Sequence, residues 1–195
     1  MKPIRIAALA AAMSFVALGG IAFSLAHHSA HAAEMTVEVG GAPMYPSKNI
    51  IENAVNSKDH TTLVAAVKAA GLVETLQGDG PFTVFAPTNE AFVKLPKGTV
   101  EQLLQPENKA ALTNILTYHV IAGKYSAEAL MKAVKDGGGK AAFKTVEGEE
   151  LTVTQDGRKL EIVDAKGGKS FVTIADINQK NGVIHVVDTV LLPKG

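Results

Sequence analysis

The stretch Phe82-Thr83-Val84-Phe85-Ala86-Pro87-Thr88-Asn89-Glu90-Ala91-Phe92 predicts a strand that runs directly into a capped helix. Successive side chains of a strand point to opposite faces, so Val84 and Ala86 share one face while Phe85 lies on the other. The proline that follows ends the strand, and the Thr88 hydroxyl can then accept from the first free amides of a helix. We expect the phenylalanines of this stretch to belong to the core.

Two further segments complete a pattern that extends over most of the chain. Asn181-Gly182-Val183-Ile184-His185-Val186-Val187-Asp188-Thr189-Val190-Leu191-Leu192-Pro193 is a second apolar stretch, and Tyr118-His119-Val120 lies between the two. In this order the three segments resemble the fasciclin (FAS1) domain, with its two signature boxes and its Tyr-His motif. The resemblance runs from about Asn49 to Pro193 and implies a single-domain bacterial secreted type.

The rest of the sequence predicts an α+β fold. Apolar residues recur at helical spacing before and after the first box, whereas the last third alternates with the period of strands. Asp156-Gly157, between two alternating segments, is a strong hairpin signal. Helices first and strands later are typical of α+β domains, and the resemblance sharpens this to a compact β-sandwich with several helices packed along one side. Residues 33–48 show little periodicity and are expected to form an N-terminal arm or linker.

The first 32 residues are predicted to be a signal peptide. Lys2 and Arg5 form a basic start, an uncharged apolar run follows, and Ala30-His31-Ala32 offers the small residues of a cleavage site. Cleavage is expected after Ala32, with Ala26 as the alternative. The apolar run is also long enough to span a bilayer, which leaves an uncleaved anchor open. After cleavage we expect a protein of the periplasm or the exterior that does not insert into the membrane.

Composition excludes several classes of function. The chain has no cysteine, which removes disulfides, thiolate metal sites and thiol catalysis. Cleavage removes two of the 19 basic residues and none of the 19 acidic residues, so the mature chain is weakly negative. A weakly negative protein has no electrostatic case for binding nucleic acid.

The sequence contains no enzyme or metal signature that we can identify. No serine lies in a Gly-x-Ser-x-Gly elbow, and no phosphate-binding glycine loop is present. His60, His119 and His185 are far apart in sequence and lack the spacing of metal ligands. The apolar face that His185 shares with its neighbours indicates a core histidine. We therefore expect no catalysis, no cofactor and no metal.

Tyr118 and His119 are the first pair of candidate partner-binding residues. The resemblance implies this role, because the matching pair in animal fasciclin proteins has been implicated in integrin binding. Their position between an apolar helix and Val120-Ile121 favours another interpretation: a half-buried histidine that bonds to backbone and holds the helix end in place.

Asp176 and Ile177 are the second candidate pair. They fall where animal members carry an Asp-Ile integrin motif, although the Glu-Pro that precedes the Asp in some animal repeats is absent here. The alternative is an aspartate that stabilises a loop or turn.

The function predicted from these observations is an exported interaction or adhesion module. Its partner would be a protein or a glycan of the cell envelope, and a monomer is expected. The alternative is a periplasmic small-ligand-binding protein or an enzyme with an unrecognised site. A deep pocket would favour that alternative, whereas an exposed apolar patch would favour the interaction module.

Overall fold

The computed structural model describes residues 35–194, so the predicted signal peptide lies outside the described residues. Its main sheet has seven strands, in the order β4-β3-β9-β8-β7-β6-β5. The bounds of these strands are β3 (Phe82–Pro87), β4 (Val120–Ala122), β5 (Lys140–Lys144), β6 (Glu150–Asp156), β7 (Lys159–Val163), β8 (Lys169–Gln179) and β9 (Gly182–Val187). The two edge strands approach each other through a bridge between Ile121 and Thr145, so the sheet nearly closes into a barrel.

The two signature boxes lie side by side as the second and third strands of this sheet, next to the β4 edge. β3 and β9 pair in parallel from Phe82↔Gly182 to Pro87↔Val187, which places Phe85 opposite His185. All other neighbouring strands of the sheet run antiparallel. The predicted hairpin is confirmed: β6 and β7 are joined at Asp156↔Lys159.

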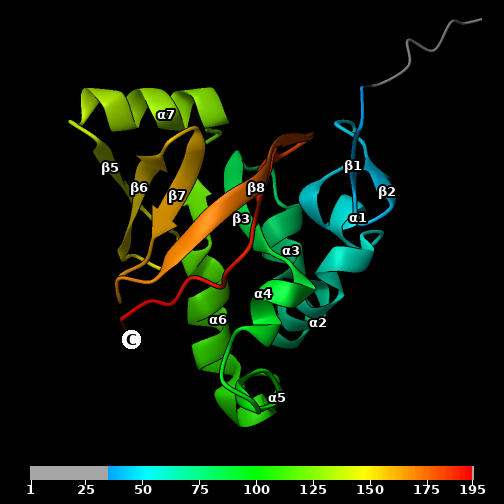
Figure 1. Cartoon of the computed structure of the whole chain (residues 1–195). Helices are drawn as coiled ribbons and strands as arrows, with labels where there is room; N and C mark the ends of the chain where they lie inside the picture. The colour runs from blue at the N-terminus through cyan, green and yellow to red at the C-terminus, as the bar shows by residue number, and fades with distance from the viewer. Residues whose placement is uncertain (1–34, 195) are drawn as a thin grey trace, which may run out of the picture. The chain divides into compact units, whose positions relative to one another are not determined.

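Most helices lie on one side of the β3–β9 pair, as expected, whereas α7 lies across the β5–β7 end of the sheet (Figure 1). The predicted cap at Thr88 is present, since its hydroxyl accepts from the Ala91 amide, and the Ser126 hydroxyl caps α7 in the same way through the Ala129 amide. The helices are α1 (Ile50–Ala54), α2 (Thr61–Ala70), α3 (Val73–Gln77), α4 (Asn89–Val93), α5 (Thr99–Leu103), α6 (Lys109–Tyr118) and α7 (Ala127–Asp136), with 3₁₀ turns at Lys58–His60 and Pro106–Asn108.

Because both faces of β3 and β9 are covered, the domain has two hydrophobic cores. Val84 and Ala86 pack with α1, α2 and α6, as their shared strand face predicts. Phe85 faces the other way and packs with α7 and with apolar residues of β6 and β7 across the curled sheet. The sheet thus packs against itself in the manner of a sandwich, and the α+β prediction is confirmed.

The structure differs from the sequence analysis before residue 49. Residues 37–44 form a hairpin of β1 (Val37–Val39) and β2 (Ala42–Met44) instead of an irregular arm. Val39 and Met44 are only 4% and 3% exposed and belong to the first core. Each strand has three residues, which is too short for an alternating pattern to stand out.

Two boundaries of elements fall within the motif segments. Tyr118 is the last residue of α6 and His119 is its C-cap, because the His119 amide still bonds to the Leu116 carbonyl. The last strand ends at Val187. Beyond it, the amides of Leu191 and Leu192 bond to side chains instead of a neighbouring strand. Across residues 35–194, no helix is both long enough and apolar enough to cross a membrane.

Candidate functional site

His119 is a fully bonded internal residue. It is 2% exposed, with Nδ1 2.7 Å from the Ile115 carbonyl oxygen and Nε2 3.0 Å from the Leu191 amide nitrogen. Since the Leu191 N–H can only donate, Nε2 accepts and Nδ1 carries the proton given to Ile115. Burial lowers the pKa of His119 to about 4, against the smaller opposing effect of the Ile115 hydrogen bond. The imidazole is therefore neutral at pH 7 and ties α6 to the C-terminal segment.

Tyr118 is buried beside it on a different set of partners. Its hydroxyl donates to the Glu150 carbonyl at 3.0 Å and accepts from the Ala165 amide at 2.9 Å. Burial raises the pKa of Tyr118 to about 12, although the Ala165 bond acts in the opposite direction. The Tyr-His pair thus faces two parts of the interior rather than one shared site.

Asp176 and Ile177 lie within β8, at an irregularity in its pairing with β9. Asp176 has a φ of 58°, a left-handed conformation that is uncommon for a residue with a side chain. Its carboxylate accepts from the Ala127 amide at 2.7 Å, which caps the first turn of α7. Ile177 is 1% exposed and packs in the first core.

A partner-binding role stays a prediction for all four candidates, Tyr118, His119, Asp176 and Ile177. The structure does not bring the four together: Tyr118 and Ile177 belong to different cores. Their functional groups, where polar, are engaged in bonds inside the domain. A partner could reach the three buried side chains only after a local opening of the fold.

His185 is a core histidine, as its apolar strand face predicts. It is fully buried, and its ring stacks on that of Phe85 with centroids 5.8 Å apart. Nδ1 accepts from the Asp176 amide and Nε2 donates to the Tyr125 carbonyl. Burial lowers its pKa, with smaller opposing contributions from Tyr125 and Asp176.

Two asparagines of the signature boxes join distant elements, and sequence reasoning missed both roles. The Asn181 side chain accepts from the Ile50 amide at 3.1 Å and donates to the carbonyls of Leu76 and Gly78, each at 2.8 Å. Asn89 accepts from the Thr62 amide and donates to the Lys58 carbonyl, which caps α2. The available signal in the sequence was an asparagine beside an apolar segment. That signal does not predict which backbone groups the asparagine side chain will contact.

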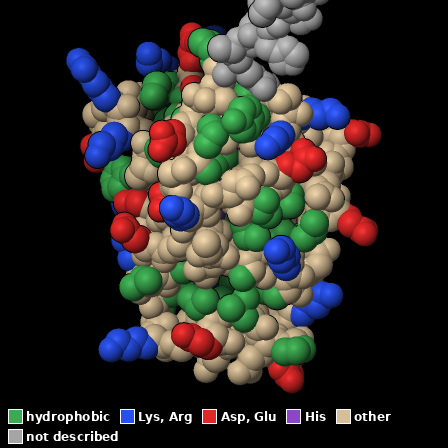
Figure 2. Space-filling model, turned by 90° about the vertical axis from the view of Figure 1, so that its right-hand side faces the viewer, with side chains coloured by type: hydrophobic (Ala, Val, Ile, Leu, Met, Phe, Trp, Pro, Cys, Tyr) green, Lys and Arg blue, Asp and Glu red, His purple; other side chains and the backbone are tan. Residues whose placement is uncertain are grey.

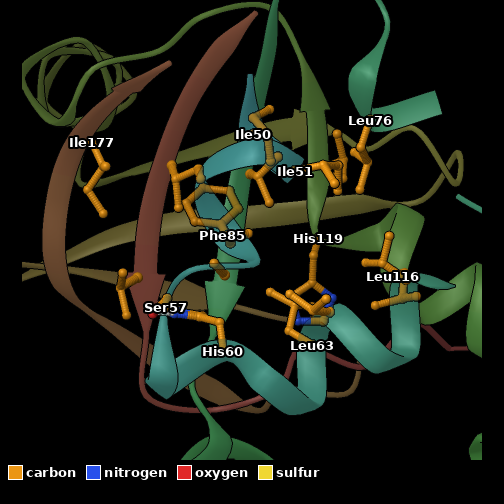
Figure 3. Close-up of a pocket in the computed structure, with 18 of the residues that line it drawn as sticks. Ile50, Ile51, Ser57, His60, Leu63, Leu76, Phe85, Leu116, His119 and Ile177 are labelled. Atoms are coloured by element: carbon orange, nitrogen blue, oxygen red, sulfur yellow. Dashed lines mark hydrogen bonds between the residues drawn. The ribbon is translucent and has the colours of Figure 1, made fainter. Parts of the chain in front are cut away.

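An apolar cavity of about 50 Å³ lies in the first core. Figure 3 shows side chains from α1, α2, β3 and α6 around it, together with the bond between Ser57 and His60. His60 Nε2 is buried and has no hydrogen-bond partner among residues 35–194. Over the same residues, no cluster of histidine, aspartate and glutamate has the size needed to hold a metal ion.

The chain belongs to the fasciclin domain family. A model of that family matches residues 58–193. Protein sll1483 of Synechocystis sp. is 44% identical over 185 residues, which are 93% of this chain and 95% of that protein. Immunogenic protein MPB70 of Mycobacterium bovis is 36% identical over 145 residues, 72% of this chain and 66% of that protein.

Relatives from animals share the domain within other architectures. Human periostin is 35% identical over 144 residues, which are 73% of this chain but 16% of periostin. A solved FAS1 domain pair from the insect cell adhesion molecule fasciclin I has the same fold, with a TM-score of 0.68 at 18% identity. That match covers 82% of this chain and 58% of the solved chain. The predicted family and fold are thereby confirmed.

Proposed function

We propose that this protein is exported and acts at the cell surface or in the periplasm as an interaction module for a protein or glycan partner, without catalysis. The observation that carries the proposal is how the polar residues of the family motifs are used. Asn89, His119 and Asn181 bond to backbone inside the domain, so they build the fold instead of a reactive centre. Recognition then depends on the exposed surface.

The exposed surface suits a polar interface. Figure 2 shows the face beside β1, β2 and α1, where hydrophobic side chains are interspersed with charges of both signs. The exposed large apolar side chains are far apart in the sequence: Val93 is 82% exposed, whereas Val55 and Val146 are about half exposed, at 48% and 44%. Scattered apolar residues are normal for protein surfaces, and interfaces of modest affinity are about as apolar as the rest of the surface.

The family supplies the second support. Fasciclin I is named as a cell adhesion molecule, and the present chain has its fold. A fold by itself does not define a function, so the proposal rests on the combination of that fold, the predicted signal peptide and the internal use of the motif residues.

Export and binding can be tested separately. Cells that produce the full chain are fractionated, and the envelope form is expected to begin at residue 33; an intact N-terminus held in the membrane would indicate an anchor.

For the binding test, purified chain is titrated onto immobilised envelope material. Binding that saturates and is lost after protease treatment indicates a protein partner, whereas loss after periodate oxidation indicates a glycan. Binding that does not saturate on any fraction would contradict the proposal.

A further inference from the structure

His60 has an unusual bonding state for a buried histidine of this domain. It is 4% exposed, and its Nδ1 lies 2.9 Å from the Ser57 hydroxyl, which is itself buried. The Ala86 backbone raises the pKa of His60, against the larger lowering effect of burial, yet Nε2 has no hydrogen-bond partner among residues 35–194. His119 and His185, in contrast, use both ring nitrogens.

Either tautomer of His60 leaves Nε2 unsatisfied. If Ser57 donates to Nδ1, Nε2 carries a proton with no acceptor; if Nδ1 donates to Ser57, Nε2 is an acceptor with no donor. A buried polar atom without a partner destabilises a fold, and each native case calls for an explanation. A hydroxyl group can satisfy both tautomers, because it donates and accepts.

The residues around His60 favour a ligand with an apolar hydrocarbon part. Leu63, Val84 and Ile184 line the cavity with it, and most of the lining side chains are apolar. The charged lining residue, Lys68, is exposed. A charged ligand would lose its hydration in the apolar interior without a partner of opposite charge.

The size of the cavity limits the ligand to a small molecule. A closed cavity of ~150 Å³ takes up a whole benzene molecule, and this one has a volume of about 50 Å³. A ring would therefore be enclosed only in part. One water molecule needs ≳ 10–15 Å³ of such volume, so water is the competing occupant.

We propose that this cavity binds a small neutral alcohol or phenol, whose hydroxyl bonds to His60 Nε2 and whose hydrocarbon part packs against Leu63, Val84 and Ile184. This site is independent of the proposed surface interaction. It would make the domain a carrier or sensor of such molecules in addition to an interaction module.

The test compares phenol with toluene, which has the same shape without the hydroxyl. The purified full chain is titrated with each while the methyl resonances of Leu63, Ile184 and the remote Ile162 are followed by NMR. Phenol is expected to shift the Leu63 and Ile184 methyls in a saturable way and to leave Ile162 in place. His60→Asn keeps an amide opposite Ser57 but removes Nε2, and it should reduce the preference for phenol over toluene about fivefold, the worth of one net hydrogen bond.

A second variant covers the case in which His60→Asn does not fold. Leu63→Ala enlarges the cavity and leaves His60 in place, so it should bind phenol more tightly with the preference retained. Ile162→Val, in the second core, is the matched control and should change neither affinity nor preference. The proposal is overturned if phenol shifts no cavity methyl in the parent and in Leu63→Ala, which would leave water as the occupant. It is equally overturned if the phenol preference is the same with and without Nε2.

Discussion

The polar residues of the family motifs form hydrogen bonds that link elements distant in sequence. Asn181 joins the start of α1 and the end of α3 to the turn before β9, across more than 100 residues of chain. His119 joins α6 to the C-terminal segment. Each presents a donor and an acceptor in a geometry that a substitute of similar size cannot fully reproduce, because the partners are backbone groups with fixed roles.

Asn181→Asp should strongly destabilise the domain. The carboxylate removes two donors, and its charge faces the carbonyls of Leu76 and Gly78 in a buried position. Each unsatisfied buried group costs ~1–3 kcal/mol, so we expect a loss of at least ~3 kcal/mol at neutral pH. Chemical denaturation measures this. The exposed Asn114→Asp is the control and should change the free energy of unfolding by less than ~0.5 kcal/mol. Equal effects of the two substitutions would contradict the assignment of Asn181 as a buried residue that links these elements by hydrogen bonds.

His119→Ala should cost about 1–3 kcal/mol, because it leaves the Leu191 amide and the Ile115 carbonyl without their side-chain partner. His119→Gln can replace one ring nitrogen and should lose less. Thermal melting and binding to the envelope fraction are measured for both. Unchanged melting with lost binding in both variants would instead identify His119 as a contact residue.

At the scale of elements, the N-terminal hairpin belongs to the domain. Asn53 of α1 donates to the Tyr45 carbonyl and accepts from the Tyr45 amide, which connects α1 to the residue that follows β2. The same side chain donates to Gln179 at the end of β8. These buried bonds hold residues 37–54 against the sheet and complete the wall of the cavity.

Met44→Ala tests this assignment. Met44 is 3% exposed, so truncation should remove ~2–5 kcal/mol of stability, as in other cores. Met35→Ala is the matched control, because the same side chain is 90% exposed nine residues earlier. Urea denaturation of both variants separates them. If Met44→Ala unfolds at the parent's midpoint, the hairpin does not contribute to the core.

At the scale of the whole molecule, residues 35–194 contain three buried neutral histidines on different elements. His60, His119 and His185 all have lowered pKa values, with burial as the largest cause in each case. Protonation of any of them would place a charge in an apolar interior, and in His119 and His185 it would also break a bond in which a ring nitrogen accepts. The free energy of unfolding therefore depends on pH through all three histidines.

Acid should destabilise the protein well before its carboxylates titrate. A histidine with a folded pKa below its unfolded value contributes stability that is fully present above about pH 6.5 and is lost as the pH falls toward the folded pKa. For His119, with a folded pKa of about 4, the loss between pH 7 and pH 5 is about 2 kcal/mol. His60 and His185 act in the same direction. Denaturation curves at both pH values test this, and His119→Gln should show a flatter dependence; a free energy of unfolding that rises toward pH 5 would contradict the assignment.

Local patterns in the sequence determined the main elements of this protein. The alternation in the first box places Val84 and Phe85 in opposite cores, the Thr88 hydroxyl caps α4, and Asp156-Gly157 leads into the turn between β6 and β7. These features depend on neighbouring residues and are therefore visible in sequence. Three motif segments, compared as a set, were sufficient to predict the family.

Only the tertiary structure decided what the polar residues do. Asn181 meets the backbone at Leu76, and His119 meets the backbone at Leu191; no local pattern contains both partners of such bonds. The hairpin before residue 49 is stable because Val39 and Met44 enter a core built by residues far downstream. For the same reason His60 looked like an ordinary histidine in sequence. Its Nε2 has no partner because the packing of distant segments brings no suitable donor or acceptor within hydrogen-bond distance.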